Sequence, residues 1–319
     1  MKKLTFVLIL VIFSLTENSL YATKWRVNNS GVPADFTTAQ AVINSSSVMN
    51  GDTVYFESSM TDYGNMTLTK RLVVIGPGYF LSENDSTQAE MKPATLSLVI
   101  FTDGSQGSII KGMTFVSYTS IQVSRITLEN NNLSDLYVSG GTGHIIIRNY
   151  IYYVIINNNS DNVLLCSNII TRSANNNLYP SISMSYASAT IMNNIFLGYI
   201  YISNSIFRNN ISLSTSAPDC FVPTNCLIEN NIGASTQFGT ENGNQQNVDM
   251  STVFMNTGST DGKYILKAGS PAIGAGTGGT DCGIFGGNYP YQLSGIGSMP
   301  SVWYMNMNGN NVTVKAKSH

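Results

Sequence analysis

Acidic side chains are the first candidates for chemistry, because glycoside hydrolysis uses two carboxyl groups, one as an acid and one as a base or nucleophile. The central part of the chain, between Gly104 and Thr240, contains five of them: Glu129, Asp135, Asp161, Asp219 and Glu229. No two lie closer than six positions apart in the sequence. Such dispersed carboxylates predict neither a paired hydrolase site nor the six to eight oxygen ligands that calcium takes. We therefore expect no metal ion and no cofactor.

Basic and tyrosine side chains suggest a second reaction, the removal of a proton next to the carboxylate of a uronic acid. A lyase needs a base for that proton and a cation that neutralises the carboxylate and the developing enolate. The candidates are Lys111, Arg125, His144, Arg148, Tyr150, Tyr152, Arg172 and Arg208. His144 stands alone in the segment GGTGHII, so we interpret it as a turn residue. No catalytic residue is assigned, and a polysaccharide lyase or glycoside hydrolase with an unrecognised site stays open as an alternative.

Aromatic side chains suggest a non-catalytic role, because a sugar-binding cleft combines apolar walls with a few polar groups. Five residues follow a recurrent Asn or Gly at a spacing of four to six positions: Tyr118, Tyr137, Tyr153, Arg172 and Tyr199. If they point outward, they form a strip that suits polysaccharide, which Tyr150, Tyr152 and Tyr201 could widen. If they point inward, the rings fill the core instead.

The Asn-containing phrase that sets this spacing recurs along the chain and is clearest in NNIFLGYIYISNSIFRNNISL, residues 193–213. Its successive anchors are Gly112, Asn132, Asn149, Asn168, Asn194, Asn210 and Asn231. The phrase thus returns about every 20 residues, which indicates a repeat architecture. The runs between turns are short and rich in β-branched residues, which predicts strands rather than helices.

A coil of short parallel strands that rises about 4.8 Å per turn accounts for this pattern. Asparagine tolerates the left-handed backbone of a tight corner, and its amide can bond to the amide one turn away. We expect an interior column formed by Ile110, Leu128, Ile147, Leu165, Ile195, Ile211 and Ile232. Arg148 and Arg208 would lie three turns apart, about 14 Å, which is too far to grip one carboxylate.

The segments at both ends add a more specific signal. PADFTTAQAVINSS (33–46) predicts an amphipathic helix, NGDTVYF (50–56) a strand, and LTKRLVVIGPG (68–78) a strand with a breaker. GSPAIGAG (269–276) and NVTVKAK (311–317) stand near the other end. With the Asn-cornered repeats, these segments resemble the secreted bacterial parallel β-helix proteins of the pectin-lyase-like group. The resemblance implies an all-β, right-handed, single-stranded parallel β-helix, a solenoid with an N-terminal helical cap.

Residues 1–22 have the layout of a secretory signal peptide, with Lys2 and Lys3 before an apolar run from Leu4 to Leu15. The run is shorter than the roughly 20 residues that cross a bilayer, so we expect no membrane span after its removal. The protein would then be secreted or periplasmic. Only 11% of the residues are charged and the formal net charge is −2, which argues against a nucleic-acid partner. Export would permit a disulfide between Cys220 and Cys226, and the alternative is four unpaired thiols.

The predicted organisation is a signal peptide (1–22), an N-terminal cap (23–53), a parallel β-helix (54–235) and a C-terminal capping segment (236–319). One fold carries many functions, so three remain open. We favour a non-catalytic secreted protein that contacts extracellular or cell-surface polysaccharide through the tyrosine strip. The alternatives are the lyase or hydrolase named above and a structural protein that mediates surface interactions.

Overall fold

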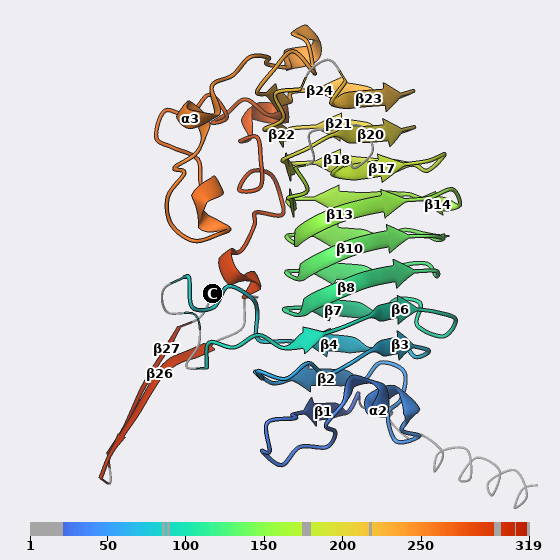
Figure 1. The fold of residues 1–319 in the computed structure, drawn as a ribbon, viewed down its shortest axis with the longest axis vertical. Helices are drawn as coiled ribbons and strands as arrows, with labels where there is room; N and C mark the ends of the chain where they lie inside the picture. The colour runs from blue at the N-terminus through green and yellow to red at the C-terminus, as the bar shows by residue number, and fades with distance from the viewer. Residues whose placement is uncertain are drawn as a thin grey trace, which may run out of the picture.

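The computed structural model describes residues 22–84, 87, 90–173, 180–216, 219–296, 301–309 and 311–317. All of the predicted signal peptide except Ala22 lies outside these residues. The chain forms a parallel β-solenoid of about nine turns, here called rungs, so the predicted all-β solenoid is confirmed (Figure 1). A search of the described residues finds no helix with the length and apolar character that crossing a bilayer takes.

Two long parallel sheets form the walls of the coil. Sheet A contains, in spatial order, β1 (Lys24–Val27), β2 (Thr53–Phe56), β4 (Val73–Ile75), β7 (Ile109–Lys111), β9 (Thr127–Glu129), β12 (Ile145–Ile147), β15 (Val163–Cys166), β18 (Ala189–Met192), β21 (Ile206–Arg208) and β24 (Leu227–Glu229). Sheet B contains β3 (Met66–Leu68), β5 (Thr95–Leu96), β6 (Val99–Phe101), β8 (Thr114–Ile121), β10 (Asn132–Val138), β13 (Tyr150–Ile156), β16 (Ile169–Ile170), β17 (Ile182–Met184), β19 (Ile195–Phe196), β20 (Ile200–Ser203), β22 (Ile211–Ser212), β23 (Phe221–Thr224) and β25 (Ile232–Gly233). Most strands therefore pair with the equivalent strand of the next rung.

The remaining elements lie outside these two sheets. Two small sheets are formed by β11 (Gly141–Thr142) with β14 (Ser160–Asp161), and by β26 (Ser301–Asn308) with β27 (Asn311–Lys317), the latter pair antiparallel. The helices are α2 (Ala39–Asn44), α3 (Met250–Val253), η1 (Glu241–Gly243), η2 (Gly262–Tyr264), η3 (Thr277–Gly279) and η4 (Leu293–Gly295). Helix α2 begins within the segment that predicts it and buries Ala39, Val42 and Ile43 in the core of the coil.

Asparagines form the corner that leads from the later strands of sheet A, β9 to β24, to sheet B. Seven buried side chains stack in one ladder: Asn131, Asn149, Asn168, Asn194, Asn210, Asn231 and Asn244. In the first six, the side-chain Nδ2 donates to the Oδ1 of the next asparagine at 3.0–3.1 Å, and the backbone N–H of the same residue donates to that oxygen at 2.9 Å. The predicted amide ladder is therefore present.

Two predicted anchors of this ladder are displaced by one position. Asn132 begins β10, and the ladder position belongs to Asn131. Gly112 occupies the left-handed position before the ladder, with φ of 70°. In later rungs that position is held by residues with φ between 53° and 59°: Asn130, Arg148, Ser167, Asn193, Asn209 and Asn230. From β9 onward, each corner thus combines one left-handed residue with one ladder residue.

The interior column differs from the predicted one. Ile110, Leu128 and Leu165 lie in it, but the residue between the last two is Ile146, which pairs with both. Ile147 is wrong for this column because it occupies the alternate position on its strand, where side chains point to the opposite face. The other predicted members, Ile195, Ile211 and Ile232, pair with one another and belong to a second hydrophobic cluster that includes the C-terminal segment.

The C-terminal segment closes the last rung and then runs back along the side of the coil. Phe238 packs on Phe207 and Phe221, with ring centroids 5.6 and 4.8 Å away. Residues 249–296, here called the strap, lie beside the coil in orange and red, and the β26–β27 hairpin projects away from it (Figure 1). The predicted capping segment therefore covers mainly the side of the solenoid.

A buried carboxylate fastens the strap. Asp261 accepts hydrogen bonds from the Ser294 N–H at 2.7 Å, from Asn84 Nδ2 at 3.0 Å and from Ser259 Oγ at 2.9 Å. Beside it, the hydroxyl groups of Tyr79 and Tyr291 lie 2.6 Å apart. These contacts join the loop after β4 to two parts of the strap, so distant segments of the sequence are locked together.

All four cysteines are unpaired. The Cys226 Sγ donates to the Thr224 carbonyl at 3.3 Å, and the Cys282 Sγ donates to the Asn230 carbonyl at 3.2 Å. The suggested disulfide between Cys220 and Cys226 is therefore wrong, and the alternative of four thiols holds.

Candidate functional site

The tyrosine strip lies on the outer face of sheet B, where β8, β10 and β13 pair side by side. Tyr118 and Tyr153 both lie opposite Asp135, and Tyr137 follows two positions further along β10. Residues two apart on a strand share a face, so these side chains project together. The Tyr137 ring stands between the other two, with centroid distances of 5.9 Å to Tyr118 and 6.4 Å to Tyr153.

The rings meet edge to face, with both pairs of ring planes 85° apart. This geometry is favourable for aromatic pairs and is worth roughly 0.5–1.5 kcal/mol per pair beyond burial. Tyr118 is 43% exposed, whereas Tyr137 and Tyr153 are half-buried. The strip therefore has a fixed arrangement and still offers aromatic surface to solvent.

A cation and a carboxylate border the rings. The Arg172 guanidinium carbon lies 4.4 Å from the Tyr153 ring centroid and 5.7 Å from that of Tyr152. Asp135 Oδ2 accepts a long hydrogen bond of 3.5 Å from the Tyr137 hydroxyl. Asp135 was not among the predicted strip residues, although its place two positions before Tyr137 on a strand puts it on the same face.

Both half-buried phenols stay protonated well above neutral pH. Burial raises the pKa of Tyr137, and the nearby Asp135 carboxylate raises it further. Burial also raises the pKa of Tyr153, and the Arg172 charge offsets this only in part. At neutral pH the strip thus presents neutral hydroxyl groups that can both donate and accept hydrogen bonds.

Tyr199 does not join the strip. The expectation that it points outward is wrong, because its side chain is only 5% exposed and belongs to the buried set. Its ring contacts Tyr201, at a centroid distance of 6.4 Å. Two of the residues that could widen the strip differ in their surroundings. Tyr152 lies under Arg172, whereas the Tyr150 ring packs against Phe80 of the second hydrophobic cluster, with ring centroids 5.0 Å apart.

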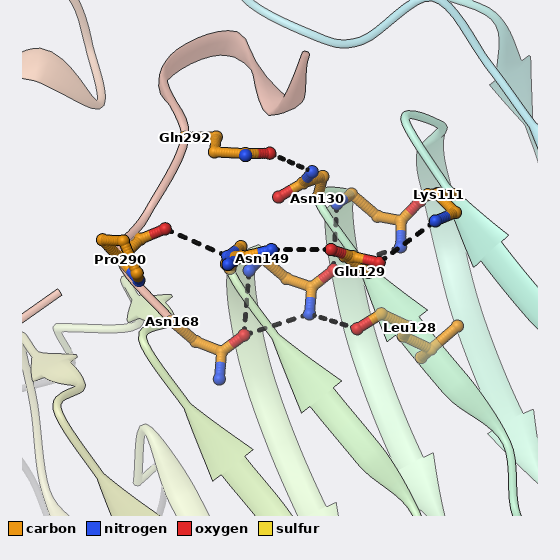
Figure 2. Close-up of polar contacts among 10 residues, drawn as sticks. Lys111, Leu128, Glu129, Asn130, Asn149, Asn168, Pro290 and Gln292 are labelled. Carbon is orange, nitrogen blue, oxygen red and sulfur yellow. Dashed lines mark hydrogen bonds and ion pairs between the residues drawn. The ribbon is translucent and has the colours of Figure 1, made fainter. Parts of the chain in front are cut away.

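Three of the cations considered for lyase chemistry, Lys111, Arg148 and Arg208, pair with glutamates. Glu129 pairs with both Lys111 and Arg148, at 3.3 Å and 2.8 Å respectively, and Figure 2 shows it beside Lys111. Arg148 Nε also donates to the Pro290 carbonyl of the strap at 3.0 Å. These charges tie the strap to the corner of the coil. Arg208 pairs with Glu229 at 3.6 Å. Arg208 lies on β21, three rungs away from β12, which Arg148 directly follows, so the two arginines are separated by three rungs as predicted.

His144 is a buried turn residue, as predicted. Its Nδ1 accepts a hydrogen bond from the Ile126 N–H at 3.4 Å, so the proton resides on Nε2, which donates to the Gly140 carbonyl at 3.1 Å. Burial lowers the pKa of His144 and keeps the ring neutral. With both ring nitrogens bonded to backbone groups, His144 is poorly placed to act as a base.

Within the part of the chain that the structure describes, no group of three or more His, Cys, Asp or Glu side chains could hold a metal ion. The strip of Tyr118, Tyr137, Tyr153 and Arg172 is thus the arrangement of predicted site residues that the fold brings together. Comparison of the sequence with protein-family models and with curated proteins found no match.

Proposed function

We propose that this protein is a non-catalytic, secreted solenoid that binds extracellular or cell-surface polysaccharide along the tyrosine strip. The observation that carries the proposal is the set of three adjoining tyrosine rings and one arginine on an outer sheet face. Four successive rungs contribute to it, which corresponds to a length of roughly 14 Å. That length suits a chain of sugars better than a single one.

The chemistry of the strip fits a carbohydrate. Aromatic faces suit the C–H faces of sugar rings, and the neutral phenols, Asp135 and Arg172 can bond to hydroxyl groups. Tyr137 and Tyr153 are already held by their neighbours, so binding would cost little side-chain entropy.

The enzyme alternative has less support. The strip contains one carboxylate, Asp135, whereas glycoside hydrolysis uses two. Glu129, Lys111 and Arg148 are engaged with one another and with the strap. Loss of retention in variants of the strip would distinguish polysaccharide binding from a structural role without a ligand.

We also infer that the coil is right-handed and that the protein belongs with the secreted pectin-lyase-like solenoids. Parallel strand connections are right-handed in about 98% of cases. The burial of Ala39, Val42 and Ile43 from helix α2 suits a cap over the first rungs, which a solenoid needs to cover its apolar end. The signal peptide predicted from residues 1–22 supports export.

The test is a polysaccharide array that records both retention and the unsaturated product of lyase action. Tyr118→Ala and Tyr153→Ala should each weaken retention about tenfold or more, equivalent to about 1.4 kcal/mol. Tyr186→Ala is the matched control, because Tyr186 is 85% exposed and lies in a loop after β17. Equal retention by wild type and both strip variants would refute the proposal, and an unsaturated product would favour the lyase.

A further inference from the structure

We propose a second binding site, for neutral oligosaccharides, in a groove at another corner of the coil. The groove lies where β15, β18, β21 and β24 begin, and its lining includes Asn162, Ser188, Thr190, Asn204, Ile206 and Asn225. The tyrosine strip lies on the outer face of β8, β10 and β13, so the two sites share no residue. The inference does not depend on the function proposed for the strip.

Polar side chains from four successive rungs form one wall of this groove. Asn162, Ser188, Asn204 and Asn225 each stand just before a strand of sheet A, and the three asparagines have left-handed backbone with φ of 54°, 46° and 54°. Asn225 Nδ2 donates to Asn204 Oδ1 at 2.9 Å, and both residues are exposed. The wall is therefore a short amide stack at the surface, unlike the buried ladder at the opposite corner.

The surface stack has spare hydrogen-bonding capacity. Among the described residues, Asn204 Nδ2, Asn225 Oδ1, the Asn162 side-chain amide and the Thr190 hydroxyl have no hydrogen-bond partner, although the Asn162 backbone N–H donates to Ser188 Oγ. Amides and hydroxyls both donate and accept, as do the hydroxyl groups of a sugar. Rungs are about 4.8 Å apart, comparable to the width of one sugar ring, so the wall offers a repeated set of polar groups.

An aliphatic surface adjoins the amide wall. Thr190, Ile206 and Leu227 lie opposite one another in neighbouring strands on the outer face of sheet A. Ile206 is 37% exposed and Leu227 is 48% exposed. Apolar surface beside a few polar groups is the usual composition of a small-ligand site, and it matches the C–H face and hydroxyl edge of a sugar.

The absence of charge from the groove selects neutral sugars. The lining residues are all uncharged, and the carboxylate of the neighbouring Asp161 accepts a hydrogen bond from Ser188 Oγ at 2.8 Å. An anionic sugar would lose hydration there without gaining a cation, which disfavours its binding.

The test is titration calorimetry of the full chain with cello-, xylo- and manno-oligosaccharides, and with oligogalacturonate as the anionic comparison. The double variant Asn204→Gly and Asn225→Gly removes the amides, and glycine keeps the left-handed backbone without strain. We expect the Kd for the neutral ligand that binds to rise about tenfold, as two lost hydrogen bonds imply. Asn247→Gly is the control, because Asn247 is exposed, has φ of 54° and lies outside the groove.

Three outcomes would overturn the proposal: no neutral oligosaccharide binds, oligogalacturonate binds more tightly than the neutral ligands, or the double variant binds as wild type does. Tyr153→Ala should leave this binding unchanged even if it abolishes retention on polysaccharide. The failure of one site is therefore distinguishable from the failure of the other.

Discussion

Removal of one amide from the middle of the ladder should destabilise the whole coil. Asn168 is fully buried, and its Oδ1 accepts hydrogen bonds from both the backbone N–H and the Nδ2 of Asn149, at 2.9 and 3.0 Å. Its own Nδ2 donates to Asn194 Oδ1 at 3.0 Å and to the carbonyls of Ile146 and Cys166. The side chain therefore joins three consecutive rungs.

The expected cost of Asn168→Ala follows from these partners. The Asn149 backbone N–H would lose its acceptor, and a buried unsatisfied group costs about 1–3 kcal/mol. The Asn149 Nδ2 would lose one of two acceptors but keep the Leu128 carbonyl at 2.9 Å, which adds about 0.5–1.5 kcal/mol. The free energy of unfolding should thus fall by about 1.5–4.5 kcal/mol.

An aspartate at the same position tests the direction of the ladder. Asn168→Asp keeps the accepting oxygen, but its second oxygen would face three acceptors, those of Asn194, Ile146 and Cys166. This repulsion and burial should raise the folded-state pKa above the usual value of about 3.9. Because a raised pKa penalises the charged form, the deficit should be small below about pH 4 and grow as the pH rises through the folded-state pKa.

Urea denaturation followed by circular dichroism measures these changes. Asn132→Ala is the control, because Asn132 is half-buried in the adjacent position and its side chain lies outside the ladder. Its effect should stay within about 0.5 kcal/mol. If Asn168→Ala unfolds at the wild-type urea concentration, or if Asn132→Ala costs as much, the ladder does not stabilise the coil as argued.

Three further changes have defined outcomes. Burial tends to raise the pKa of Asp52, but hydrogen bonds from Met49, Trp25 and Thr23 lower the pKa overall. The contribution of the Asp52 carboxylate to stability should therefore be lost below about pH 4. Trp25 fluorescence in a Trp303→Phe background should show this transition, and Asp52→Asn should remove it. Ile195→Ala and Leu165→Ala should each lower the free energy of unfolding by about 2–5 kcal/mol. Of the two residues, only Ile195 packs in the cluster that includes the strap, so limited proteolysis should cut residues 249–296 sooner in Ile195→Ala than in the wild type or in Leu165→Ala. At β23, the carbonyls of Cys220 and Thr224 accept hydrogen bonds from β20 and the residue after it, so Pro223 lies on the alternate, free-edge side. Pro223→Val would add an edge N–H and should increase self-association in sedimentation velocity. A sedimentation profile identical to that of the wild type would contradict this role.

Much of the fold was predictable because its signals are local. An asparagine before a β-branched run encodes a corner and a strand within one short segment, so the solenoid follows from the recurrence alone. The exact register was harder to predict. In NNN (130–132) and III (145–147) every residue suits the corner or the core, so composition does not distinguish Asn131 from Asn132 or Ile146 from Ile147.

The remaining differences arise from distant segments. Ile195, Ile211 and Ile232 have the pattern of interior residues, yet they are buried by the strap, which follows the last rung in the sequence. Tyr199 follows the longest interval between anchors, from Asn168 to Asn194, and this interval contains the strand β17. The Tyr199 carbonyl accepts a hydrogen bond from the N–H of Ser181, which directly precedes β17. The spacing that holds for Tyr118, Tyr137 and Tyr153 therefore fails there.

Fluorine NMR of the protein labelled with 3-fluorotyrosine tests the proposed polysaccharide site most directly. Single Tyr→Phe variants assign the resonances, and fragments of the polysaccharide retained on the array are then titrated. The strip predicts that the signals of Tyr118, Tyr137 and Tyr153 shift together and saturate with one Kd, while that of Tyr186 stays fixed. Binding that leaves the three strip signals unchanged would contradict the account.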